Sequence, residues 1–212
     1  MGAAISPGRQ AEVRRGLRLE YLTLGYNLLE SLVALAAGAI ASSIALIGFG
    51  VDSLIECSSG LVMLWRLRSD RTNRESAERQ AQKLIAVSFF ALAAYVAWES
   101  LETLIGREAP ERSLPGILLA VTSLIVMPLL ARAKRRVGRS LNSAAMVADS
   151  KQTELCSYLS GILLAGLGLN ASLGWWWADP MAGIVMTPVI VKEGVSAWKG
   201  KGCGCVEAPH NG

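Results

Sequence analysis

Six long apolar stretches constrain the fold of this chain more than any other feature of its sequence. Each has about twenty residues, the length that a helix needs to cross the hydrocarbon core of a bilayer. Hydrophobic residues make up 52% of the 212 residues, which favours a membrane protein over a soluble domain. We therefore predict an all-α integral membrane protein with six transmembrane helices. The predicted spans are Leu19–Ile40, Ser43–Trp65, Leu84–Ile105, Leu114–Ala131, Ala144–Leu169 and Trp175–Ala197.

The six spans form one predicted domain, residues 19–198, with a short polar segment on either side. Residues 1–18 are basic and lack the features of a cleaved signal peptide. Residues 199–212 form a tail that contains Cys203, Cys205 and His210. A structural zinc site needs about four ligands, and these three residues fall short of that number. We therefore expect a disordered tail with reduced thiols. A tail that collects metal in the cytosol is the alternative.

The basic residues predict the orientation of the spans. Lys and Arg gather before the first span, between the second and third, between the fourth and fifth, and after the sixth. The opposite side of the membrane has only Arg107 and Arg112. Because short cytoplasmic loops retain positive charge, we expect a multi-pass protein of the cell (inner or plasma) membrane with both termini in the cytoplasm. Topology explains the basic loops, and we expect no nucleic-acid partner.

Two carboxylates lie inside the second span. Asp52 and Glu56 are four residues apart, so both lie on one face of a helix. Each ionised carboxylate is costly in hydrocarbon, and carboxylates make poor contacts between packed helices. A bound divalent cation would neutralise both groups. We therefore interpret this pair as metal ligands that also accept protons when the metal leaves.

Polar residues of the fifth span share one helical stripe, because offsets of three, four, seven and eleven residues return to the same face. A thiolate on this stripe suits zinc or cadmium, and an amide oxygen is a neutral ligand. Facing the second span, the stripe would complete a four-ligand metal cage in which protons compete with the metal. The stripe is Asp149, Gln152, Thr153, Cys156 and Ser160, and the cage is Asp52, Glu56, Gln152 and Cys156.

Other charged residues in the spans have simpler interpretations. Lys151 and Glu154 lie off the stripe and three residues apart, so we expect them to pair with each other. Asn27 and Glu30 in the first span lie three residues apart and are candidates to line the same cavity as Asp52. Glu30 either lines that cavity or packs against a neighbouring helix, and both alternatives stay open. Glu99 approaches the outer end of the third span, where water can solvate it.

The runs SSIALIGFGVDSLIE, ADSKQTELCSYLS and WADPMAGIVM together resemble the membrane domain of the cation diffusion facilitator family. The resemblance extends from about Arg18 to Lys199. It implies six transmembrane helices, usually in a homodimer, that export divalent metals such as zinc from the cytosol in exchange for protons. By position it places metal ligands at Asp52 and Glu56 in the second helix, and at positions 152 and 156 in the fifth.

The fifth span departs from the family pattern, in which a His or Asp is followed four residues later by Asp. Gln152 and Cys156 occupy these two positions, and the one histidine of the chain is His210. Metal preference and proton stoichiometry are therefore open. Asp149 is an alternative ligand, paired with Thr153 or Cys156 through a register shift.

These features predict a transporter that exports a divalent metal, zinc before others, as its substrate and that needs no cofactor. The alternative is a non-transporting metal-binding or regulatory membrane protein with a degenerate site. An enzyme acting on metal-bound diphosphate would need carboxylates beside the basic loops, and the sequence has no such cluster there, so we expect no enzyme. Only residues 199–212 follow the sixth span, so we expect the membrane helices themselves to form the dimer.

Overall fold

The computed structural model describes residues 7–41, 44–69, 74–106 and 114–200, and this part of the chain is built from six α-helices without a β-strand. The predicted all-α fold is therefore confirmed. The Cys203–Cys205 tail lies outside the described residues. The helices are α1 (Pro7–Ala41), α2 (Ile44–Arg68), α3 (Arg74–Gly106), α4 (Leu114–Ser140), α5 (Ala144–Leu173) and α6 (Ala178–Trp198).

Several helices are longer than the apolar spans predicted for them. α1 begins at Pro7, a residue that suits the first turn because the missing N–H has no helical partner there. The basic segment before Leu19 is thus a continuation of the first helix. α4 likewise runs past Ala131 to Ser140 and carries its basic residues on helical turns.

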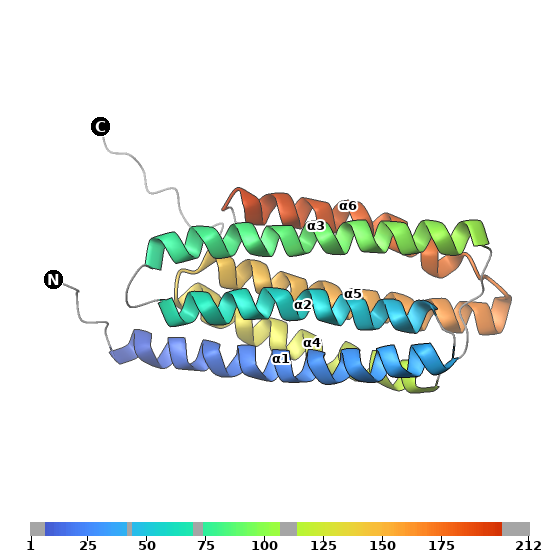
Figure 1. Ribbon diagram of the computed structural model, residues 1–212, viewed down its shortest axis with the longest axis horizontal. Coiled ribbons are helices and arrows are strands. Elements are labelled where there is room, and N and C mark those ends of the chain that lie inside the picture. The colour runs from blue at the N-terminus through green and yellow to red at the C-terminus, as the bar shows by residue number, and fades with distance from the viewer. Residues whose placement is uncertain (1–6, 42–43, 70–73, 107–113, 201–212) are drawn as a thin grey trace.

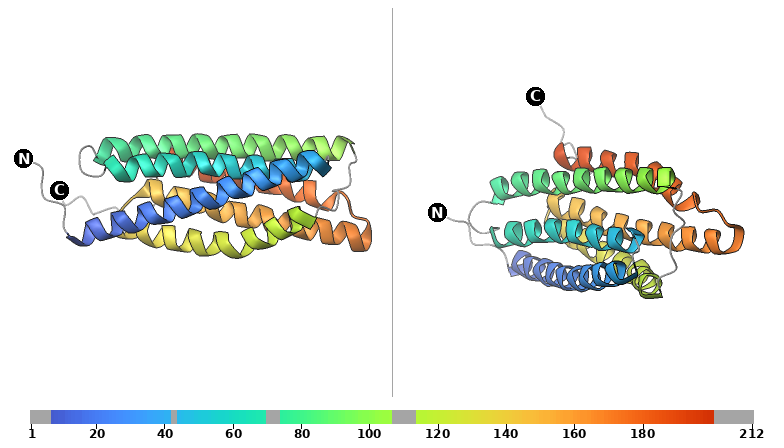
Figure 2. Two further views of the ribbon diagram at one scale, coloured as in Figure 1. Left: turned by 60° about the horizontal axis from the view of Figure 1, so that its bottom comes forward. Right: turned by 45° about the vertical axis from the view of Figure 1, so that its right-hand side comes forward.

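Four helices surround a common interior, and the other two pack against one side of them. α1 pairs with α2 and α4 pairs with α5, while contacts of α1 with α4 and of α2 with α5 close the ring. α3 and α6 pair with each other and pack on α2 and α5. Figures 1 and 2 show this arrangement, with α3 and α6 together at one edge of an elongated bundle.

The interior of the four-helix ring is polar, whereas its contact with the outer pair is apolar. The largest cluster of buried apolar side chains includes Phe89, Ile85 and Leu92 of α3 together with Met63 of α2 and Ile190 of α6. Because lipid tails are as apolar as these side chains, the helices are held together in a bilayer by close van der Waals packing. Polar and ionisable residues of membrane-spanning segments usually face the interior of the bundle in this way.

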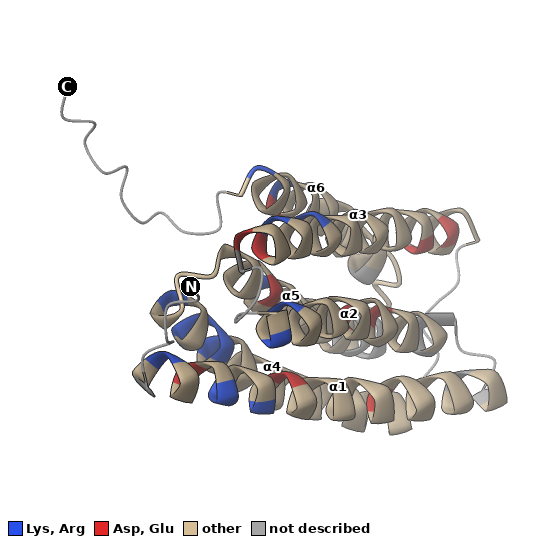
Figure 3. Cartoon of the chain, turned by 60° about the vertical axis from the view of Figure 1, so that its left-hand side comes forward, with Lys and Arg blue, Asp and Glu red and all other residues tan. Residues whose placement is uncertain are grey.

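Basic residues gather at one end of the bundle, which we name the basic end. Both termini of the described chain and the α4–α5 turn lie at this end (Figure 3). By length and composition, and within the described residues, three segments are long and apolar enough to cross a membrane. They are Ile47–Arg68 in α2, Glu75–Gly106 in α3 and Leu114–Ser140 in α4.

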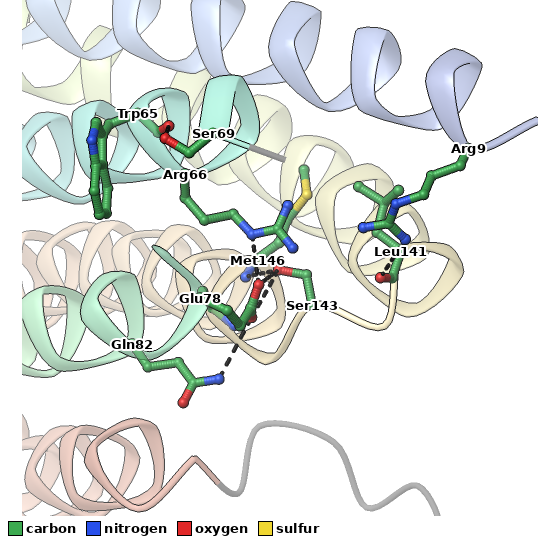
Figure 4. Close-up of polar contacts among 10 residues, drawn as sticks. Arg9, Trp65, Arg66, Ser69, Glu78, Gln82, Leu141, Ser143 and Met146 are labelled. Carbon is green, nitrogen blue, oxygen red and sulfur yellow. Dashed lines mark hydrogen bonds and ion pairs between the residues drawn. The ribbon is translucent and has the colours of Figure 1, made fainter. Parts of the chain in front are cut away.

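Glu78 of α3 holds the α4–α5 turn in place at the basic end (Figure 4). Its carboxylate accepts hydrogen bonds from the Ser143 hydroxyl at 3.0 Å and from the Ala145 N–H at 2.8 Å, and it pairs with buried Arg66 of α2 at 2.6 Å. An anion is favourable at a helix N-terminus. Ser143 itself caps α5 by accepting the Met146 N–H. One carboxylate therefore links α2, α3 and the start of α5.

Candidate metal site

The four predicted cage residues all lie in the interior of the four-helix ring. Asp52 and Glu56 on α2 are 5% and 2% exposed, and Gln152 and Cys156 on α5 are 1% and 2% exposed. The Cys156 thiol interacts with both carboxylates of α2. The helical stripes inferred from sequence spacing therefore point toward each other, and the second and fifth helices meet along them.

Several polar atoms of these side chains lack a hydrogen bond of ordinary geometry. Asp52 Oδ2, both carboxylate oxygens of Glu56 and both amide atoms of Gln152 are buried without a hydrogen bond. Buried polar groups in proteins are almost always hydrogen-bonded, because a group that loses its hydrogen bonds to water and gains no other raises the free energy of the folded state. The unpartnered oxygens of Asp52, Glu56 and Gln152 are of the kind that a metal cation takes as ligands.

The side chains of the four cage residues do not form a complete metal coordination shell in this structure. Within the described residues, no group of three or more His, Cys, Asp or Glu side chains lies close enough to hold one metal ion. Gln152 is not among these residue types, and the interior set contains only Asp52, Glu56 and Cys156 from them. Coordination of one metal ion by this set therefore requires its side chains to come closer together than they are in this structure.

Asp149, the alternative ligand, is already engaged in a buried ion pair. Its Oδ2 lies 2.7 Å from Lys134 Nζ on α4, and its Oδ1 accepts a hydrogen bond from the Ser59 hydroxyl on α2. Lys134 Nζ also lies 2.9 Å from Glu20 Oε2 on α1. We name Glu20, Ser59, Lys134 and Asp149 the ionic layer; all four side chains are fully buried.

The sequence pattern placed Asn27 in the same cavity as Asp52, and Asn27 is indeed fully buried, but Glu20 and Lys134 were not singled out as interior residues. A signal for Glu20 was present, because Glu20, Thr23, Asn27, Glu30 and Ala34 follow one another at steps of three or four residues, which marks one helical face, and all five are buried. Both amide atoms of Asn27 are buried without a hydrogen-bond partner. In the sequence Lys134 is one of the basic residues between the fourth and fifth spans, and a lysine near a helix end usually reaches water. It therefore indicated only the orientation of the helices in the membrane.

Glu30 lies in the ring interior and is well bonded. It accepts hydrogen bonds from the hydroxyls of Ser53 at 2.8 Å, Ser123 at 2.6 Å and Tyr26 at 3.2 Å. These bonds join α1 to α2 and to α4. Of the two alternatives from the sequence, the described contacts match helix packing, although the carboxylate also interacts electrostatically with Glu56.

The predicted pairing of Lys151 with Glu154 is wrong. Lys151 pairs with Glu193 of α6, and Glu154 pairs with Arg135 of α4. Both side chains point away from the interior stripe, as the spacing indicated, but α5 is packed between two helices that each offer an opposite charge. A neighbouring helix can thus outcompete a local pair, which contributes only a few tenths of a kcal/mol.

Glu99 of α3 is half-buried rather than freely solvated. Its carboxylate and the Tyr95 hydroxyl lie over Gly48 of α2, where a Cβ atom would overlap both groups. Gly48 therefore permits close approach of α2 and α3 one turn before Asp52. The carboxylate interacts electrostatically with Asp52, so α3 adds negative charge beside the ring interior.

Comparison with known proteins matches most of the chain to a transporter family. Residues 21–199 match the family described as the cation efflux transmembrane domain. An uncharacterized transporter of Synechocystis is 26% identical over 168 residues, 76% of this chain and 54% of that protein. One of Methanocaldococcus jannaschii is 26% identical over 179 residues, covering 81% and 63%.

Transmembrane protein 163 of Xenopus laevis is 25% identical over 187 residues, which are 86% of this chain and 66% of that protein. The chain thus spans between 54% and 66% of the length of these three relatives.

Proposed function

The chain belongs to the cation efflux family of membrane transporters, and from this premise we propose that it exports a divalent metal cation, zinc in the first instance. The observation that carries the proposal is the set of buried, unpartnered polar atoms on Asp52, Glu56 and Gln152 beside the Cys156 thiol. Two carboxylates balance the charge of a divalent ion, and a thiolate favours zinc and cadmium over magnesium or manganese.

We propose that protons exchange for the metal at the same groups. The ionisable ligands bind metal only when they are deprotonated, so metal release leaves two carboxylates together in a site of low dielectric. Like charges at close range in such a site favour uptake of a proton by at least one of them. Asp52 and Glu56 would then carry protons in the direction opposite to the metal. This coupling makes the protein an antiporter.

The proposed orientation places the basic end in the cytosol. Arginine and lysine residues are retained on the cytoplasmic side of short loops, and Figure 3 shows them concentrated at the basic end. Metal would therefore enter the ring from the end that carries the α4–α5 turn and leave at the opposite end. We also propose that the protein is a homodimer formed through its membrane helices, because the family that it resembles usually forms homodimers.

Reconstitution tests the transport proposal. Purified protein in proteoliposomes is given zinc, cadmium, cobalt, manganese and iron under an imposed pH gradient, while metal uptake and internal pH are recorded. We expect zinc and cadmium uptake with opposite proton movement. Asp52→Asn should abolish both, whereas Glu102→Gln, which makes the same change at an exposed position of α3, should leave them intact. Metal binding without uptake would favour the non-transporting alternative.

A further inference from the structure

The interior of the ring is closed at its two ends by different chemistry. Toward the end opposite the basic end, Phe49 of α2 and Ala34 of α1 are buried together, with Leu119 of α4 and Leu163 of α5 packed against them. Toward the basic end, the ionic layer fills the same interior with three charged side chains and a hydroxyl. The Asp52–Glu56 pair lies between these two closures.

The ionic layer has the composition of an occupied cation site. The Lys134 ammonium lies 2.7 Å from Asp149 Oδ2, 2.9 Å from Glu20 Oε2 and 3.4 Å from Thr153 Oγ1. These oxygens come from two different helices, α1 and α5, and the ammonium comes from a third, α4. Carboxylate and hydroxyl oxygens are also what a divalent cation takes as ligands.

A second observation indicates spare coordination capacity in the ionic layer. Glu20 is fully buried, and its Oε1 has no hydrogen bond, whereas its Oε2 lies 2.9 Å from Lys134 Nζ. Glu20 and Asp149 supply two carboxyl groups beside the single ammonium of Lys134. Ser59 binds Asp149 but brings no charge. The layer therefore offers two carboxylates to one ammonium, and a divalent cation in place of the ammonium would match the charge of both carboxylates in their ionised form.

We propose that Glu20 and Asp149 form a second divalent-cation site between the basic end and the Asp52–Glu56 pair. The Lys134 ammonium occupies this site as a tethered cation until an incoming metal displaces it. The inference rests on the proposed function, since it gives the transported metal a binding step before the central site. Lys134 suits this role because its ammonium is a compact charge on a flexible stem and can leave without movement of α4.

The spacing of the residues supports a path from this second site to the central one. Gln152 and Cys156 follow Asp149 on the same stripe of α5, so the two sites are about 5 to 10 Å apart along the helix axis. Glu56 is also attracted electrostatically by Lys134. A metal released from Glu20 and Asp149 would therefore meet the next carboxylate within one or two helical turns.

Removal of the ammonium tests the second site. Full-length protein and its Lys134→Met variant are purified in detergent, and bound cadmium or zinc is counted by equilibrium dialysis and elemental analysis. We expect the variant to bind one more metal ion per chain than the wild type. The double variant Lys134→Met with Glu20→Gln should lose the extra ion. Equal stoichiometry in the wild type and Lys134→Met overturns the inference.

The matched control is Lys151→Met, which removes a lysine from another ion pair of α5, with Glu193, outside the ring interior. It should bind the same number of metal ions as the wild type, and an extra ion in this control would overturn the assignment to Glu20 and Asp149. Failure of the proposed function looks different: the wild type would then bind no metal that depends on Asp52, whatever Lys134→Met binds.

Lys134→Arg keeps the inference testable if Lys134→Met does not fold. A guanidinium binds two carboxylates through a planar fork and is harder to displace than an ammonium. We expect Lys134→Arg to fold, to bind metal at the central site and to transport it at least tenfold more slowly than the wild type. Transport at the wild-type rate would show that displacement of the lysine is not a step in transport.

Discussion

Lys134 Nζ on α4 lies 2.7 Å from Asp149 Oδ2 on α5, and neither side chain has any solvent exposure. This contact bears directly on the choice between two registers of the predicted metal site. With Asp149 held by Lys134 and Ser59, the residues of α5 left unpartnered beside the α2 carboxylates include Gln152. We therefore propose that Gln152 and Cys156, rather than Asp149, complete the central site.

Glu56→Gln is expected to fold at least as stably as the wild type while losing stabilisation by metal. Both carboxylate oxygens of Glu56 are buried without a hydrogen bond, so the neutral amide removes a buried charge and few contacts. Saturating zinc at about 100 times its Kd should stabilise the wild type by about 2.7 kcal/mol and the variant by far less. Thermal unfolding in detergent with and without zinc measures both effects. A much lower melting temperature for metal-free Glu56→Gln would instead make Glu56 a structural residue.

Substitutions on α5 should change metal preference without removing binding. Gln152→His supplies an imidazole, a stronger zinc ligand than an amide oxygen, and should tighten zinc binding tenfold or more. Cys156→Ser removes the soft ligand and should weaken cadmium binding more than manganese binding. Competition with chelators of known affinity measures these constants. Identical cadmium and manganese affinities in Cys156→Ser and the wild type would exclude the thiol from the site.

Glu78→Ala is expected to destabilise the protein by about 2–4 kcal/mol, because it leaves Arg66 without its carboxylate and removes an N-terminal cap of α5. Glu75→Ala is the matched control on the same helix. Glu75 is 88% exposed and pairs only with Arg79 one turn away, so its loss should cost less than about 0.5 kcal/mol. Unfolding curves in mixed micelles compare the two. Equal stability of both variants would show that the contacts of Glu78 are dispensable.

Ser123→Ala should destabilise the bundle by about 1–3 kcal/mol, since it removes a 2.6 Å hydrogen bond to the buried Glu30 carboxylate. Thr122→Ala is the neighbouring control, because the exposed Thr122 hydroxyl bonds only to the Leu118 carbonyl in its own helix. The same unfolding measurement applies. If Ser123→Ala instead abolishes metal transport at unchanged stability, Glu30 belongs to the transport path rather than to helix packing.

The sequence by itself determined the class of fold and half of the candidate site. Apolar stretches of about twenty residues can only be membrane helices or deeply buried ones, so the six helices followed from length and hydropathy. A spacing of four residues places Asp52 and Glu56 on one helical face whatever the tertiary structure is. The stripe on α5 followed from the same periodicity, and the structure indeed buries its residues in the ring.

Only the tertiary structure decided which polar residues have partners. Periodicity gives the face of a helix but not the residue opposite it, so the contact of Lys134 with Glu20 and Asp149 depends on how three helices far apart in sequence pack together. For the same reason Lys151 pairs with Glu193 of α6 and Glu154 pairs with Arg135 of α4, and they do not pair with each other. Spacing alone made Asp149 an alternative metal ligand, but the packing of α5 against α4 places the Lys134 ammonium on its carboxylate.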